Sequence, residues 1–147
     1  MCEVFDEWMR EDVGRIFVQI FESTLANWMG VEPGLCALSP TCGLATVMEA
    51  DGTVYACDHF VFPEYRLGNI REQTLTEILY GERLRRFGQE KLTALPRQCR
   101  ECPFLFACHG ECPRNRFMTD RYGEPGLNYL CQGYRQFFTH VTGKVLV

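Results

Sequence analysis

The sequence lacks the features that would assign it to a membrane or nucleic-acid-binding class. No apolar run approaches the roughly 20 residues that span a bilayer, and no internal repeat or low-complexity tract is present. The chain opens without the apolar segment of a secretory signal. Strong charge of either sign is also missing, because the net charge is only −4 and no basic stripe alternates with aromatic residues. We therefore expect neither membrane nor nucleic acid among its partners.

The composition does supply enough apolar material for a packed core. Hydrophobic residues make up 46% of the 147 positions and aromatic residues 13%, so a disordered tail is excluded. A chain of this length predicts one domain, or one domain with a fragment of another.

Cysteine is abundant, with nine in total, and five of them are concentrated near the C-terminal end. Four thiols fall within fourteen positions, and a fifth follows after eighteen further residues. A CxxC turn directs two sulfurs at one point, which suits the tetrahedral thiolate sites of zinc and of iron–sulfur clusters. Five thiols are one too many for a single four-ligand site, and three more lie upstream. The eight divide into two sets of four: Cys36, Cys42, Cys57, Cys99, Cys102, Cys108, Cys112 and Cys131.

A disulfide framework is the alternative to bound metal. The odd number of cysteines, the CxxC spacing and the missing secretory segment all argue against disulfides. The pattern therefore indicates metal ligands in a reducing, cytoplasmic compartment. Cys2 has no partner at ligand spacing, so we interpret it as a structural or incidental thiol.

The first thirty residues predict a helix, a strand and a second helix. Apolar side chains at helical spacing within residues 3–12 predict the end of an amphipathic helix. The apolar run at residues 15–21 favours a buried parallel strand, and residues 22–24 can cap a helix that continues to Trp28. This order is typical of an α/β barrel, but it occurs only once. We therefore interpret residues 1–31 as the C-terminal remnant of such a barrel.

Residues 32–147 predict an α+β domain in which a small β-hairpin and short helices surround the two four-cysteine sites. Asp51-Gly52 between two β-type runs is a strong hairpin signal. Pro63 and Gly68 indicate a loop, and Thr74 to Glu77 form a capping box that opens a short helix. A C-terminal helix is predicted from Leu127 onward, with Cys131 on its apolar face.

Specific motifs in this part of the chain resemble a known domain. Cys42-x9-Gly52-x4-Cys57, then the dense cysteine cluster and the later Cys131, resemble the SPASM domain of radical S-adenosylmethionine enzymes that modify peptides and proteins. The resemblance runs from about residue 36 to the C-terminus. Among such enzymes the chain is most similar to the anaerobic sulfatase-maturating enzymes, on four features: Cys36-x5-Cys42, Cys57-Asp58, the segment 65–70, and Leu127-Asn-Tyr129 followed by Cys131-Gln132.

The resemblance implies two auxiliary 4Fe-4S clusters with interleaved ligands. By position, Cys36, Cys42, Cys57 and Cys112 would hold the first cluster, and Cys99, Cys102, Cys108 and Cys131 the second. Clusters with four thiolate ligands would carry electrons and not bind substrate. The spacing leaves zinc open as the metal in the isolated domain.

The resemblance also implies a reaction in which a sulfatase Cys or Ser becomes Cα-formylglycine. A radical made from S-adenosylmethionine at a third 4Fe-4S cluster removes a hydrogen atom, a base takes a proton, and an electron leaves for a carrier such as flavodoxin or ferredoxin. Asp58 occupies the position of the base, and a carboxylate beside an anionic centre should have a raised pKa. The alternative is that Asp58 only caps a turn.

The sequence departs from the family in lacking the CxxxCxxC motif of the barrel, so the chain alone is expected to be inactive. Two other functions stay open. The domain could serve an enzyme that modifies another peptide, for example with a thioether crosslink. It could also be a non-catalytic zinc or iron–sulfur module for binding or electron transfer.

Overall fold

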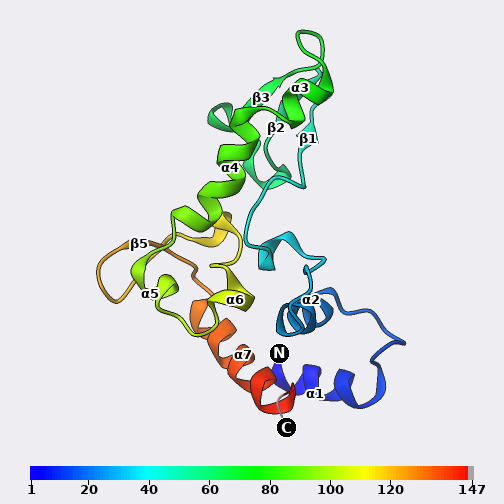
Figure 1. The fold of residues 1–147 in the computed structure, drawn as a ribbon, viewed down its shortest axis with the longest axis vertical. Coiled ribbons are helices and arrows are strands. Elements are labelled where there is room, and N and C mark those ends of the chain that lie inside the picture. Colours follow the sequence, from blue (N-terminus) through cyan, green and yellow to red (C-terminus); the bar gives the residue numbers. More distant parts are fainter. Residues whose placement is uncertain (146–147) are drawn as a thin grey trace. The chain divides into compact units, whose positions relative to one another are not determined.

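The computed structural model describes residues 1–145 and divides into two compact units. The first unit combines Met1–Ser39 with Leu95–Val147, and the second is Pro40–Ala94. Short helices and small antiparallel sheets make up both units, as the α+β prediction expected (Figure 1). Residues 1–145 contain no helix with the length and apolar character needed to cross a bilayer.

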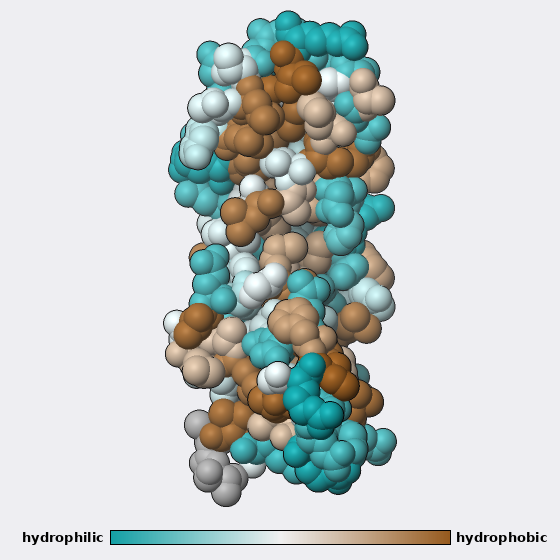
Figure 2. All heavy atoms as spheres, turned by 90° about the vertical axis from the view of Figure 1, so that its right-hand side faces the viewer, coloured by the Kyte–Doolittle hydropathy of each residue, from teal (hydrophilic) through white to brown (hydrophobic). Residues whose placement is uncertain are grey.

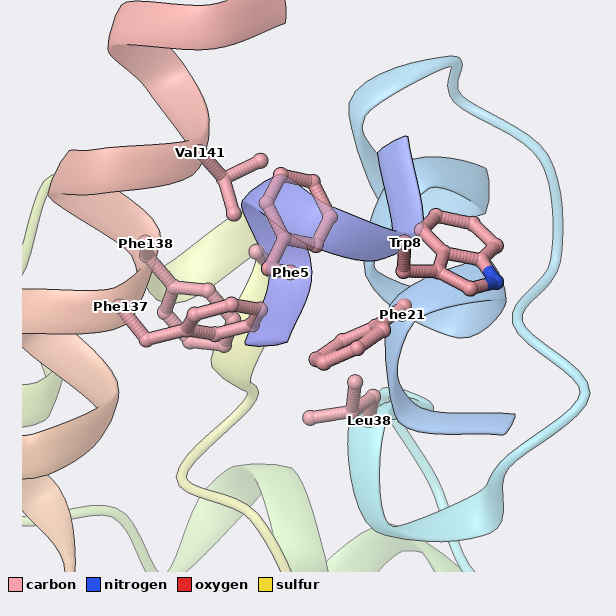
Figure 3. Close-up of a cluster of buried hydrophobic side chains, with 8 residues drawn as sticks. Phe5, Trp8, Phe21, Leu38, Phe137, Phe138 and Val141 are labelled. Atoms are coloured by element: carbon pink, nitrogen blue, oxygen red, sulfur yellow. The ribbon is translucent and has the colours of Figure 1, made fainter. Parts of the chain in front are cut away.

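The core of the first unit is aromatic and lies between three helices. Helix α1 spans Cys2–Glu11, α2 spans Gln19–Trp28, and α7 spans Cys131–Val145. Figure 3 shows side chains from all three converging, with Phe5 of α1 among them. The Phe5 ring packs edge-on against Phe21 at 5.2 Å and Phe137 at 5.5 Å between centroids. The fully buried members of this cluster are Phe5, Leu38, Ala107, Phe137, Phe138 and Val141.

The strand predicted at residues 15–21 is wrong. These residues form a turn and then the start of α2, which begins at Gln19. A buried strand hides side chains on both faces, but Ile16 is 53% exposed and Phe17 is 73% exposed. The turn is held where the Trp8 indole N–H donates to the carbonyl of Ile16 at 2.7 Å. The apolar run therefore supplies one helical anchor, Phe21, and no strand.

Short elements between Leu95 and α7 carry the dense cysteine cluster. Helix α5 spans Arg97–Arg100, α6 spans Leu105–Cys108, and the 3-10 helix η4 spans Pro113–Asn115. Strands β4 (Met118–Thr119) and β5 (Pro125–Leu127) pair antiparallel and lead into α7. The C-terminal helix thus starts at Cys131 and not at Leu127, which pairs with Met118 in the sheet. The remaining 3-10 helix of this unit, η1, is Cys36–Leu38.

The second unit is a three-stranded antiparallel sheet with two helices. Strand β1 (Val47–Met48) pairs with β2 (Thr53–Tyr55) across the Asp51-Gly52 turn, which confirms the predicted hairpin. A third strand, β3 (Arg66–Asn69), pairs with β2 where the sequence indicated only a loop. Its 3-10 helices are η2 (Asp58–Phe60) and η3 (Pro63–Tyr65), and its α-helices are α3 (Leu75–Leu79) and α4 (Glu82–Thr93).

Large apolar side chains also lie at the surface. Figure 2 shows apolar patches interleaved with polar ones over the face that it presents. Phe17, Leu44 and Tyr80 are each more than 70% exposed. Scattered exposure of this kind is normal in folded proteins, so it does not by itself mark a site.

Truncating Phe5 to alanine is expected to destabilise the first unit by about 3–5 kcal/mol, because it leaves a cavity between three helices. The thermal unfolding midpoint of the protein should fall by roughly 10 °C. Phe17→Ala is the matched control, since Phe17 is 73% exposed and its loss should cost at most about 0.5 kcal/mol. Equal midpoints for the two variants would contradict the assignment of Phe5 to the core.

Candidate metal centre

Four of the predicted ligands line one pocket in the first unit. Cys99 lies on α5, Cys102 follows that helix, Cys108 ends α6, and Cys131 begins α7. Two short helices, the loop that follows α5 and one long helix are therefore needed to bring the four thiols together. All four carry free thiols, so no disulfide competes for their sulfur atoms.

The walls of this pocket are mostly apolar. Phe104 and Leu105 line it from the start of α6, and Tyr134 and Phe138 line it from α7. The pocket is small, with a cavity volume of about 30 Å³. Phe138 also belongs to the aromatic core, so the pocket and the core share a wall. Four sulfurs in an apolar setting suit a thiolate-bound metal centre that is shielded from water.

The electrostatics of the thiols agree with their convergence. Burial, with a smaller contribution from negative charge on Cys131 and Cys102, raises the pKa of Cys99 to about 11. Burial likewise raises the pKa of Cys108 to about 12 and that of Cys131 above its ordinary value. Thiols that disfavour one another's ionisation lie close together. A bound cation would reverse this preference, because metal coordination favours the thiolate.

Hydrogen bonds to sulfur support two of these thiols. The side-chain amide of Gln98 donates to Cys131 Sγ at 3.7 Å, and the backbone N–H of Gly110 donates to Cys108. Gln98 is itself held, because its backbone N–H donates to Asp120 Oδ2 at 3.0 Å. Such bonds orient metal ligands and tune the potential of thiolate centres.

Gly110 allows the chain to turn between Cys108 and Cys112. It has φ +71°, and a Cβ atom there would lie 2.3 Å from Leu95 Cδ2. Only glycine combines this left-handed backbone with so close a neighbour.

The other four predicted ligands are divided between the two units. Cys36 begins η1 and Cys112 precedes η4 in the first unit, while Cys42 and Cys57 lie in the second. Their assignment to one site stays a prediction. Cys2 packs against the aromatic core and does not line the pocket of the second set.

Gly88 is a residue of the second unit that the sequence analysis missed. The backbone N–H of Cys42 donates to the carbonyl of Gly88 at 3.1 Å. A Cβ atom on Gly88 would lie 2.4 Å from the Cys42 carbonyl oxygen, so only glycine lets the Cys42 loop approach α4 this closely. The available signal was an isolated glycine in the middle of a helical pattern, which usually has a packing reason.

Asp58 is exposed and lies next to the Cys57 thiol. Cys57 Sγ donates to Asp58 Oδ1 at 3.1 Å, and this bond lowers the pKa of Asp58. The sequence predicted a raised pKa for Asp58, which is the opposite direction. That prediction assumed an anionic neighbour, whereas a protonated Cys57 thiol donates a hydrogen bond that favours the carboxylate. His59 completes a group in which one ligand atom of each residue lies within 4.8 Å of the others.

Comparisons with known proteins identify a matching family model and several similar enzymes. A family model described as an iron–sulfur cluster-binding domain, SPASM, matches residues 42–103. Serine-type anaerobic sulfatase-maturating enzymes of Bacteroides thetaiotaomicron and Klebsiella pneumoniae are 62% and 37% identical to this chain, each over 96% of its length and 34% of their own. A cysteine-type enzyme of Clostridium perfringens is 28% identical over 97% of this chain and 39% of its own length.

Solved structures show the same fold. The structure described as anSMEcpe with bound AdoMet superposes with a TM-score of 0.80 at 28% identity, covering 99% of this chain and 38% of that one. The structure with bound AdoMet and Cp18Cys peptide gives 0.81 at 28% identity, covering 99% of this chain and 40% of that one. This chain therefore spans between about a third and two-fifths of the length of the proteins it matches.

Proposed function

We propose that this chain is the auxiliary-cluster part of an anaerobic sulfatase-maturating enzyme, because the SPASM family model matches residues 42–103 and the chain is homologous to the C-terminal portion of such enzymes. The complete enzyme would oxidise a sulfatase side chain to Cα-formylglycine. The observation that carries this proposal is the 62% identity to a serine-type enzyme, together with four cysteines around one apolar pocket. We also propose that residues 1–31 are the C-terminal remnant of the enzyme's α/β barrel and that residues 32–147 form the auxiliary-cluster domain.

The identity values favour serine over cysteine as the oxidised residue. The serine-type relatives named above are 62% and 37% identical, whereas the cysteine-type relative is 28% identical. Conversion of a serine to the aldehyde removes one hydrogen atom, one proton and one electron from the side chain. The hydrogen atom, the proton and the electron would leave through different parts of the enzyme.

When bound, S-adenosylmethionine with its own cluster supplies the radical, and the two auxiliary 4Fe-4S clusters supply a one-electron outlet. This chain would hold the outlet through its thiolates: Cys36, Cys42, Cys57 and Cys112 in one set, and Cys99, Cys102, Cys108 and Cys131 in the other. Phe104 and Phe138 would exclude water from the second set, since both line its pocket. The electron would leave for an external carrier such as flavodoxin or ferredoxin.

Asp58 would accept the proton. Its support is positional: the carboxylate directly follows a proposed ligand and is exposed, so a substrate can reach it. A general base has to lie within hydrogen-bond reach of the proton that it removes. Because Asp58 is exposed, its carboxylate can be ionised without the cost of burying a charge.

The test is a mass measurement on peptide substrates. The full-length enzyme that contains this chain, S-adenosylmethionine and a reductant are incubated with a sulfatase-derived peptide that has serine at the modified position. We expect the peptide mass to fall by that of one hydrogen molecule, and we expect slower conversion of the cysteine peptide. An unchanged mass for both peptides would indicate an enzyme that modifies another class of peptide.

Metal analysis separates the enzyme from a binding module, because four thiolates also fit zinc. Anaerobically purified protein with two 4Fe-4S clusters should contain about eight iron atoms per chain. One or two zinc atoms without iron would instead indicate a non-catalytic zinc module.

A further inference from the structure

A buried carboxylate lies between two of the proposed ligands. Glu111 stands between Cys108 and Cys112 and is 6% exposed. Its φ of +54° is in the left-handed region, which favours glycine. Burying a carboxylate is unfavourable unless hydrogen bonds replace the lost water. A residue with both of these costs must make contacts that a glycine cannot make.

The carboxylate joins two segments that carry ligands. Glu111 Oε2 accepts hydrogen bonds from Asn115 Nδ2 at 2.9 Å and from Asn128 Nδ2 at 2.5 Å. Asn115 lies three residues after Cys112, and Asn128 lies three residues before Cys131. One oxygen atom therefore connects the loop after α6 to the turn before α7.

Asn128 in turn determines where α7 begins. It is 3% exposed, and its Oδ1 accepts the backbone N–H of Leu130 at 2.7 Å. Its backbone carbonyl accepts the N–H of Cys131 at 3.1 Å. Both bonds shape the turn from which the Cys131 side chain projects into the pocket. A shift of Asn128 would therefore move Cys131.

Two further contacts keep the loop in place around Glu111. The carbonyl of Asn115 accepts the backbone N–H of Tyr129 at 3.1 Å, which ties the same two segments a second time. The Arg116 guanidinium donates to the carbonyls of His109, Gly110 and Glu111 at 2.8 to 2.9 Å. The loop is thus held on both sides. The direct side-chain contact with Asn128 is made by the Glu111 carboxylate.

We propose that Glu111 is a positioning residue for the metal centre: through Asn128 its carboxylate fixes Cys131 relative to the loop that carries Cys108 and Cys112. The inference rests on the proposed ligand sets. It explains why a glutamate occupies a backbone conformation better suited to glycine. It also places a fixed negative charge beside the centre that Cys108 and Cys131 would form.

The experiment uses two substitutions that separate the carboxylate from the backbone. Glu111→Gly allows the left-handed backbone without strain but removes the carboxylate that accepts the two hydrogen bonds. Glu111→Gln keeps an oxygen that can accept from both asparagines but removes the charge. Each protein is reconstituted anaerobically with iron and sulfide and then challenged with a ferrous chelator. Loss of an outer partner typically weakens metal binding about 10- to 100-fold, so the Gly variant should release iron from one centre at a lower chelator concentration.

The Gln variant should retain iron as the wild-type protein does, while the midpoint potential of its centre rises because a buried negative charge is lost. A purely structural role for Glu111 would leave that potential unchanged. The two readouts, iron retention and potential, therefore separate positioning from charge.

A reciprocal exchange guards against simple misfolding. Asn128→Asp places two carboxylates in contact and should release iron readily. Adding Glu111→Gln restores a donor and an acceptor with their roles reversed, so the double variant should recover iron retention. The inference is overturned if Glu111→Gly retains iron like the wild type, or if the double variant does not recover. A wild-type protein that binds no iron would instead overturn the proposed function on which the inference rests.

Discussion

Replacing Asp58 with asparagine is expected to stop formylglycine formation by the full-length enzyme while leaving its iron content intact. The amide is nearly the same size but cannot accept a proton. A positioned general base contributes about 10²- to 10⁴-fold to rate, so product formation should fall by at least two orders of magnitude. The rate is measured as the aldehyde peptide formed per enzyme, and iron is measured on the same samples.

Asp51→Asn is the matched control for this prediction. Asp51 lies in the turn between β1 and β2, where its Oδ1 accepts the backbone N–H of Thr53 at 2.9 Å. Asparagine is at least as well suited as aspartate to a turn that continues into glycine. The control should therefore keep both activity and iron. Normal turnover by Asp58→Asn would remove Asp58 from the role of base.

Local signals in the sequence predicted the parts of the fold that local hydrogen bonds stabilise. The Asp51-Gly52 turn forms because Gly52 adopts φ +86°. The capping box also forms: Thr74 Oγ1 accepts the N–H of Glu77, and the Glu77 carboxylate accepts the N–H of Thr74. Each of these motifs is complete within a few residues, so no distant partner is needed to interpret it.

The errors arose where a distant segment decides the conformation. Strand β3 contains Gly68, which the sequence analysis took for a loop residue. A Cβ atom on Gly68 would lie 2.9 Å from Gln73 Oε1 and 3.1 Å from Ile78 Cγ1, so this glycine allows close packing on α3. Its strand character depends on pairing with β2, and that pairing leaves no local pattern.

The candidate site was predictable in residue type but not in its supporting contacts. Cysteine spacing predicted two sets of four thiols, and the resemblance to the SPASM domain placed Cys99, Cys102, Cys108 and Cys131 in one set; these four line one pocket. The contacts of Glu111 with Asn128, and of Gly88 with Cys42, were not predictable. Glutamate does not favour a left-handed backbone, and neither pair is close in sequence. Supporting residues of a metal centre therefore need coordinates, even where candidate ligands can be proposed from cysteine spacing and a family resemblance.

Replacing a single ligand cysteine is expected to halve the iron content of the protein. If each set of four holds one 4Fe-4S cluster, Cys131→Ala should lower the iron content from about eight atoms to about four per chain. The thiol has no substitute, because within residues 1–145 the pocket is lined by no histidine or carboxylate side chain and by no cysteine beyond the other three of the set. Iron and sulfide are counted in anaerobically reconstituted samples. Cys2→Ala is the matched control, since Cys2 packs against the aromatic core, and it should keep the full iron content.

Combining two substitutions tests whether the ligand sets interleave. Cys112→Ala alone should also leave about four iron atoms, because it removes a ligand of the other cluster. If Cys112 and Cys131 serve different clusters, the double variant should bind almost no iron. If both serve the same cluster, the double variant should keep as much iron as either single variant. The second result would contradict the interleaved assignment of the ligands.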